Sequence, residues 1–156
     1  MVKYDDAAWH HGGEYPKDLP EENAATHIGM FLAWCINNDL ISEELKKEIA
    51  TKYVEDVKTR KITGAEFLIK VCDEKLIDND LSVLGQKFAD DYYETESRFA
   101  EKFGDYIGDF QQVFNEKAEK NSFEYETLYH VEDTWGNYDL IAERIDERFV
   151  KWKTLK

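Results

Sequence analysis

Hydrophobic residues recur at helical spacing along most of this chain, and the segments with that spacing predict its main elements. Residues 26–37 are apolar at nearly every position, as is typical of a helix buried on all sides, and Thr26 can cap this helix. Residues 99–114 form the clearest amphipathic stripe. Further helices are predicted from Ser42 to about 57, from Thr63 to about 72, from Ser82 to about 92 and from about 135 to 152.

Two segments lack this spacing. The first 25 residues are crowded with aromatic, imidazole and carboxylate side chains and show no hydrophobic period. Residues 121–129 alternate weakly, as in a strand or an extended loop, but no second strand is predicted to pair with them. The chain is therefore predicted to be mainly α. We expect an irregular single-domain helical bundle over residues 1–156, with an extended N-terminal loop and a short extended segment allowed near 121–131.

The composition predicts a folded, strongly acidic protein. Hydrophobic residues make up 42% of the 156 positions and aromatic residues 14%, which is too rich for a disordered acidic chain. The formal net charge is −14, and the acids are densest between Asp73 and Asp109. A field of this sign repels nucleic acid and anionic membranes, and it attracts basic proteins. We therefore expect a protein partner, with no nucleic acid and no membrane.

The cysteines and the start of the chain indicate a cellular setting. Cys35 and Cys72 both lie within apolar helical patterns, and two such thiols make no disulfide framework. The chain has no run of 18 apolar residues, and its first residues lack the apolar stretch of a secretory signal. A reduced, cytoplasmic location is therefore expected.

Three of the four histidines flank the irregular N-terminal segment, which raises the question of a site there. The chain has no His-x-x-x-His or Glu-x-x-His spacing that would bring ligands onto one face of a helix, so no metal ion or cofactor is predicted. One interpretation is that His27 hydrogen-bonds the N-terminal loop and fixes it to the first helix. The alternative is a ligand pocket between that loop and helix. The candidate pocket residues are Asp6, Trp9, His10 and His27.

Aromatic side chains lie beside carboxylates at two places in the chain. Tyrosine and tryptophan are frequent anchors of protein interfaces, so these places are candidate binding surfaces. Adjacent acids could also serve acid–base chemistry, but the chain has no phosphate-binding loop, nucleophile elbow or other catalytic motif, and no enzyme activity is predicted. The candidate partner-binding residues are Asp90, Asp91, Tyr92, Tyr93, Glu94, Glu132 and Asp133.

Three distinctive segments are Tyr4-Asp-Asp-Ala-Ala-Trp-His10, Thr26-His-Ile-Gly-Met-Phe-Leu-Ala-Trp34 and Leu128-Tyr-His-Val-Glu-Asp-Thr-Trp135. Together they resemble a family of small bacterial proteins of unknown function, some of which are suspected immunity proteins against polymorphic toxins. The resemblance extends from Tyr4 to about Trp152. It implies a compact cytosolic domain and a toxin partner, and it implies no catalytic residues.

The leading hypothesis is a cytosolic protein-binding domain, an immunity protein that neutralises a bacterial toxin by occluding its active site through an acidic and aromatic surface. The toxin is expected to be basic, because carboxylates can take the place of substrate phosphates. The alternative is a small-ligand or metal-dependent enzyme that uses the N-terminal pocket. A third hypothesis is an assembly subunit that associates with itself through the N-terminal segment.

Overall fold

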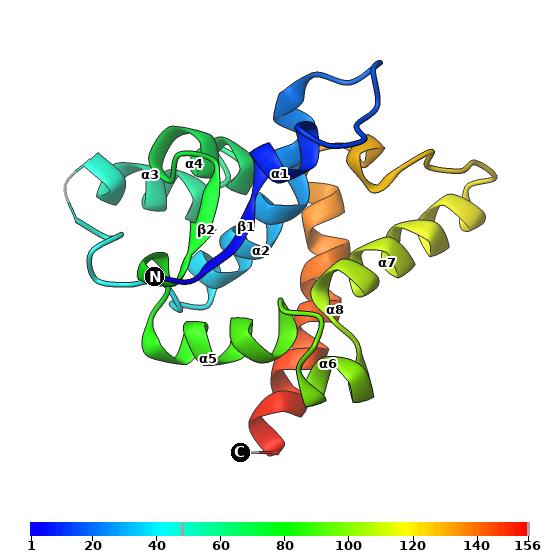
Figure 1. Ribbon diagram of the computed structural model, residues 1–156. Coiled ribbons are helices and arrows are strands. Elements are labelled where there is room, and N and C mark those ends of the chain that lie inside the picture. The colour runs from blue at the N-terminus through cyan, green and yellow to red at the C-terminus, as the bar shows by residue number, and fades with distance from the viewer. Residues whose placement is uncertain (48, 156) are drawn as a thin grey trace.

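Helices make up most of the fold in this computed structural model, which describes residues 1–47 and 49–155 (Figure 1). The mainly α class predicted from the sequence is confirmed. The helices are α1 (Ala7–His11), α2 (Thr26–Asn37), α3 (Ile49–Lys58), α4 (Gly64–Val71), α5 (Val83–Tyr92), α6 (Arg98–Phe103), α7 (Tyr106–Lys120) and α8 (Trp135–Thr154). Short 3-10 helices are η1 (Glu21–Ala25), η2 (Asp78–Asp80) and η3 (Leu128–His130).

The central element is α2, whose residues from Thr26 to Ile36 are all buried. It contacts α3, α4 and α8, and Figure 1 shows α3 and α4 on one side of it and α8 on the other. A helix that is apolar on every face is stable only where other elements cover every face. The burial predicted for this segment is therefore confirmed.

The two glycines Gly29 and Gly64 allow α2 and α4 to cross with their backbones in contact. A Cβ atom on Gly29 would lie 2.2 Å from the backbone nitrogen of Ala65, and a Cβ atom on Gly64 would lie 1.9 Å from the carbonyl oxygen of Gly29. Any larger residue at either position would collide with backbone, which cannot move aside as a side chain can. These two positions therefore set the distance between the helices.

Helix starts follow the predicted caps in part. The Thr63 hydroxyl accepts the N–H of Glu66, and the Glu66 side chain accepts the N–H of Thr63, so the predicted capping box at α4 is confirmed. Thr26 is not a cap, because η1 runs directly into α2. The second predicted helix begins at Ile49 rather than Ser42, because residues 43–46 form turns.

The amphipathic stripe over 99–114 belongs to two helices. Gly104 ends α6 with a φ of +119°, a conformation that favours glycine, and the Asp105 side chain then caps α7 by accepting the N–H of Gly108 at 2.7 Å. Asp109, the last acid of the dense run that begins at Asp73, is buried. The acidic run from Asp73 to Asp109 is therefore not one continuous face.

A two-stranded antiparallel sheet, which the sequence did not predict, joins the N-terminal segment to the middle of the chain. Strand β1 (Lys3–Asp6) pairs with β2 (Lys75–Ile77), with Asp5 opposite Leu76 and an irregularity between Lys3 and Asp5. The N-terminal segment, predicted as an extended loop, is thus a strand followed by α1, and the loop that follows over residues 12–20 contains turns and bends. Residues 121–131 contain no strand; they form a loop that ends in η3.

Aromatic rings fill the core around α2. Phe31 contacts the rings of Trp34, Phe88, Tyr92 and Tyr106, with centroids 5.2–6.4 Å apart.

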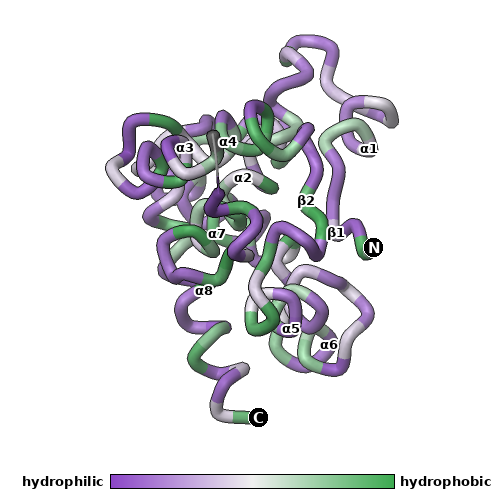
Figure 2. Tube along the Cα trace, turned by 90° about the vertical axis from the view of Figure 1, so that its left-hand side faces the viewer, coloured by the Kyte–Doolittle hydropathy of each residue, from purple (hydrophilic) through white to green (hydrophobic). Residues whose placement is uncertain are grey.

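The loop after α1, which projects at the top of Figure 2, is mostly coloured as hydrophilic. Within the described part of the chain, no helix has both the length and the apolar character needed to span a membrane.

Candidate functional site

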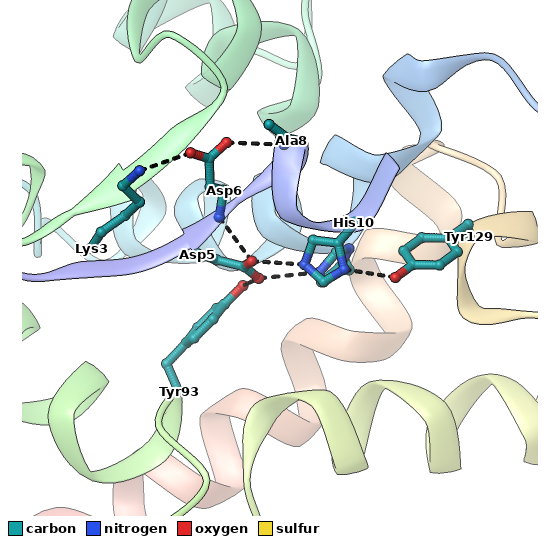
Figure 3. A network of polar contacts seen from close by, with 8 residues as sticks. Lys3, Asp5, Asp6, Ala8, His10, Tyr93 and Tyr129 are labelled. Carbon is teal, nitrogen blue, oxygen red and sulfur yellow. Dashed lines mark hydrogen bonds and ion pairs between the residues drawn. The ribbon is translucent and has the colours of Figure 1, made fainter. Parts of the chain in front are cut away.

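Asp5 lies at the centre of a buried polar network (Figure 3). Its Oδ1 atom is 2.7 Å from Nε2 of His10, and its Oδ2 atom is 3.2 Å from Nε2 of His27. The Tyr93 hydroxyl donates to Oδ2 at 2.5 Å, and the backbone N–H of Asp6 donates to Oδ1 at 2.8 Å. Each carboxylate oxygen therefore faces a different imidazole.

Three segments bring these side chains together. Asp5 is held in β1 by its pairing with β2. Asp6 then caps α1 by accepting a backbone N–H at 2.9 Å, and His10 follows within α1. His27 lies in the first turn of α2 and is 1% exposed. Because strand pairing, cap and helix are fixed by backbone hydrogen bonds, the donor atoms are held in place by rigid elements.

Tyr129 contacts the second nitrogen of His10. Its hydroxyl is 2.6 Å from Nδ1, and its backbone carbonyl accepts a hydrogen bond from the Asn23 side chain at 3.1 Å. When Nε2 of His10 donates to Asp5, Nδ1 is free to accept the phenolic proton. The ring of His10 is thus oriented from both sides.

The electrostatics of the network favour an ionised carboxylate beside a neutral imidazole. Burial alone would raise the pKa of Asp5, but hydrogen bonds from His10 and His27 outweigh burial and hold that pKa well below its usual range. Burial lowers the pKa of His27, and the Asp5 charge offsets this only in part. Burial, together with the Asp5 charge, raises the pKa of Tyr93, so the phenol keeps its proton.

One atom of the network has no partner. Nδ1 of His27 is buried and makes no hydrogen bond with any residue that the structure describes. Burying such an atom costs about 1–3 kcal/mol. The other ring nitrogen of His27, Nε2, contacts Asp5, and the ring centroids of His10 and His27 are 4.5 Å apart. Two imidazoles and a carboxylate that converge in this way can bind a metal ion or transfer a proton.

The structure places the four candidate pocket residues in two groups. His10 and His27 meet, as the pocket hypothesis requires. Asp6 faces away from them, because its carboxylate accepts from Lys3 Nζ at 2.9 Å, and Trp9 is 56% exposed with that same amine 5.1 Å from its ring centroid. The hypothesis is therefore corrected: Asp5 takes the position expected for Asp6, and Trp9 lies at the surface.

Sequence reasoning missed Asp5, Tyr93 and Tyr129 as members of this network. The signal for Asp5 was strand alternation, because neighbouring residues of a strand point to opposite faces and only one of two adjacent aspartates can face α2. No comparable signal exists for the tyrosines. Tyr93 is 88 residues from Asp5, and Tyr129 is 119 residues from His10.

Tyr92 and Tyr93 are buried, which corrects their assignment to a partner surface. The Tyr92 hydroxyl donates to Asp109 at 2.8 Å, and the Tyr93 hydroxyl donates to Asp5. Both rings also pack on other aromatic rings of the core. In this structure they cannot serve as exposed aromatic anchors.

Asp90, Asp91 and Glu94 remain at least partly exposed beside these tyrosines. Asp90 and Asp91 line a surface hollow of about 660 Å³ together with Lys87 and Lys153. Each of the two aspartates also accepts a hydrogen bond from an aromatic side chain of the protein at 2.8 Å. Two lysines therefore line the hollow beside these aspartates, and each carboxylate already has a hydrogen-bond donor within the protein.

A more acidic surface forms where two loops meet, residues 12–22 and 121–132, and we call it the acidic–aromatic face. Nε2 of His130 lies 3.0 Å from Asp18 Oδ2, and the ring centroids of Tyr15 and Tyr129 are 5.0 Å apart, so the loops are in contact. Lys17 is the only lysine or arginine in the two loops. The exposed acids of this face are Glu14, Asp18, Glu21, Glu22, Glu124, Glu126 and Glu132.

Glu132 and Asp133, the other candidate partner-binding residues, differ in exposure. Glu132 is exposed on the acidic–aromatic face and accepts the Tyr125 hydroxyl at 2.9 Å. Asp133 is half-buried and accepts the Thr63 hydroxyl at 2.6 Å, and burial raises its pKa. Asp133 thus links the loop to the start of α4, while Glu132 stays accessible to a partner.

Comparison with known proteins places the chain in a sequence family. A family model described as "Domain of unknown function (DUF7832)" matches residues 3–127. No curated protein and no solved structure matches. The matched range contains β1, α1 and α2, and with them Asp5, His10 and His27. The match carries no catalytic residues.

Proposed function

The chain belongs to the DUF7832 family, whose description states no activity, and from this premise we propose that it is a protein-binding domain. Its partner is a basic bacterial toxin, whose active site it covers in the cytoplasm, as an immunity protein does. The observation that carries the proposal is the acidic–aromatic face, whose two loops contain seven exposed carboxylates and one lysine.

The charge of this face supports a basic partner. Its acids come from two loops that contact each other, so their fields add over one surface instead of spreading around the molecule. Such a surface speeds association with a partner of opposite charge and repels acidic proteins. A toxin that acts on nucleic acid binds phosphates with lysine and arginine, and the carboxylates of the face match those cations.

Aromatic side chains give the face anchors as well as charge. Phe123 is 40% exposed, and its ring centroid is 4.9 Å from that of Tyr125. Burial and the nearby Glu132 raise the pKa of Tyr125 to about 12, so its hydroxyl stays a hydrogen-bond donor at neutral pH. Aromatic side chains are enriched in protein interfaces, where a few side chains supply most of the binding energy.

The test is capture of a partner from the native bacterial lysate, washed at low and at high salt. The variant Glu22→Lys/Glu124→Lys reverses one exposed acid in each loop. Its matched control is Glu44→Lys/Glu55→Lys, which changes the net charge equally at exposed positions near α3, on the opposite side in Figure 1. We expect one stoichiometric basic protein that high salt releases, that the first variant fails to capture and that the control captures normally.

The aromatic part of the proposal has its own variant. Phe123→Ala removes the exposed ring and leaves the charge unchanged. It should weaken binding about tenfold or more, mainly through faster dissociation. If both charge-reversal variants lose the partner equally, only net charge matters and the assignment to this face is wrong. If neither loses it, the partner binds elsewhere.

A further inference from the structure

We propose that Asp5, His10 and His27 form a binding site for a divalent transition metal ion, with Zn²⁺ as the best match. This site is distinct from the acidic–aromatic face. Its three ligand atoms are one carboxylate oxygen of Asp5 and one nitrogen of each imidazole. All three lie within 4.8 Å of one another. Two imidazoles and one carboxylate are an established ligand set for zinc and for related metals.

The observed distances are close to those that an ion requires. Zn²⁺ binds imidazole nitrogen and carboxylate oxygen at about 2.0–2.2 Å, which places neighbouring ligand atoms of a tetrahedral site about 3.3 Å apart. Nε2 of His27 is already 3.2 Å from Asp5 Oδ2, and Nε2 of His10 is 2.7 Å from Oδ1. The second contact must open by about half an ångström. Because the two imidazoles face different oxygens of Asp5, an ion between them would contact both oxygens or require the carboxylate to turn. Movement on that scale lies within side-chain adjustment.

The groups around the ligands hold them as a metal site needs. The Tyr129 hydroxyl lies 2.6 Å from Nδ1 of His10, so when Nε2 binds an ion, Nδ1 can donate its proton to that oxygen. The Tyr93 hydroxyl donates to Asp5 Oδ2 and fixes the carboxylate. Ligating histidines of known sites are oriented by outer partners of this kind, and here His10 has one while Nδ1 of His27 has none among the described residues.

Burial and access also fit the proposal. The imidazole of His27 is buried although its Nδ1 has no partner among the described residues, and a bond from Nε2 to an ion would offset the cost of that unpaired atom. The side chain of His10 is 20% exposed, which gives an ion a route from the surface. A site with one accessible ligand and two buried ones can load after folding.

A second cluster makes the test specific. Asp18, Glu126 and His130 also lie within 4.8 Å of one another, but both acids are exposed. Surface groups of this kind can retain zinc weakly, so a bound ion alone would not identify the site. Variants of His10 and His130 separate the two clusters. His11 is a further control, because it is next to His10 in α1 and its Nδ1 lies 3.9 Å from Glu21.

The experiment uses the full chain, stripped with a chelator and titrated with Zn²⁺ in competition with a chromophoric chelator. We expect one ion per chain, and Co²⁺ should give the visible absorption of a four-coordinate complex. His10→Ala should weaken binding by more than the roughly 10–100-fold typical of losing an outer partner, and Tyr129→Phe by about tenfold. His11→Ala and His130→Ala should leave the affinity unchanged.

Folding is checked separately, because His10→Ala also removes two hydrogen bonds. Circular dichroism should show native helix content, and His10→Cys, which restores a zinc ligand, should recover binding. Failure of the wild-type chain to compete with the chelator would overturn the proposal. So would loss of the ion in His130→Ala but not in His10→Ala, since the ion would then lie in the exposed cluster and Asp5 would only join hydrogen bonds.

Discussion

At the scale of single residues, Asp109 is a buried acid with two arginine partners. Arg148 donates to both carboxylate oxygens of Asp109 at 2.8 Å, and the Tyr92 hydroxyl donates to Oδ2 at 2.8 Å. Nη1 of Arg144 lies 3.3 Å from Oδ1. A buried carboxylate is tolerated only when such partners replace its water. The Asp109 carboxylate therefore links α7 to α5 and α8.

Arg148→Ala should therefore lower the free energy of unfolding by about 3 kcal/mol, because it leaves Asp109 buried with weaker compensation. The control is Lys46→Ala, whose partner Asp39 is exposed, and which should change stability little. Urea denaturation of both variants measures the difference. Equal effects would mean that the Asp109 pair contributes no more than a surface ion pair.

Asp80 shows how burial acts on a single acid. Burial raises its pKa to about 6, the N–H of Ile77 offsets this in part, and the charge of Asp78 adds to it. The folded protein then holds a proton that the unfolded chain releases near pH 4, so the stability from this group is present below about pH 4 and is lost as the pH rises through 6.

The matched variant is Asp80→Asn, which cannot ionise and can still accept the N–H of Ile77. Between pH 4 and 7, the wild-type protein should lose about 2 kcal/mol of unfolding free energy relative to the variant. Denaturation curves at several pH values measure this difference. Parallel pH profiles would show that Asp80 titrates normally in the folded protein.

At the scale of elements, α2 and α4 cross with their backbones in contact at Gly29 and Gly64. Gly29→Ala would force a Cβ atom to within 2.2 Å of the Ala65 backbone, so the helices must separate. We expect a loss of about 3 kcal/mol or more, seen as a lower thermal midpoint. The control is Gly136→Ala in α8, where a Cβ atom would meet only Thr134 Oγ1 at 4.0 Å. That variant should be neutral or slightly more stable.

At the scale of the whole molecule, local signals predicted most of the helical layout. The capping box at Thr63, the cap at Ser82 and the apolar run of α2 all lie within a few residues of what they specify. The sheet escaped prediction because β2 has three residues, too few for a period, and pairs with a strand some 70 positions away. The network around Asp5 escaped for the same reason: its members are neighbours only after folding.

The net charge of −14 makes a prediction about the whole molecule. Repulsion among exposed acids opposes the compact state, and salt screens it, with a Debye length that falls from about 30 Å at 0.01 M to about 8 Å at 0.15 M. The thermal midpoint should therefore rise over this range, by about 2–4 °C for each kcal/mol of repulsion removed. The buried pair of Asp109 and Arg148 is screened far less and should oppose this rise only weakly.

In Glu44→Lys/Glu55→Lys each change is worth two charges, so the net charge becomes about −10 and the rise in thermal midpoint with salt should shrink. A midpoint that falls with salt in both proteins would mean that attractive ion pairs outweigh the net repulsion.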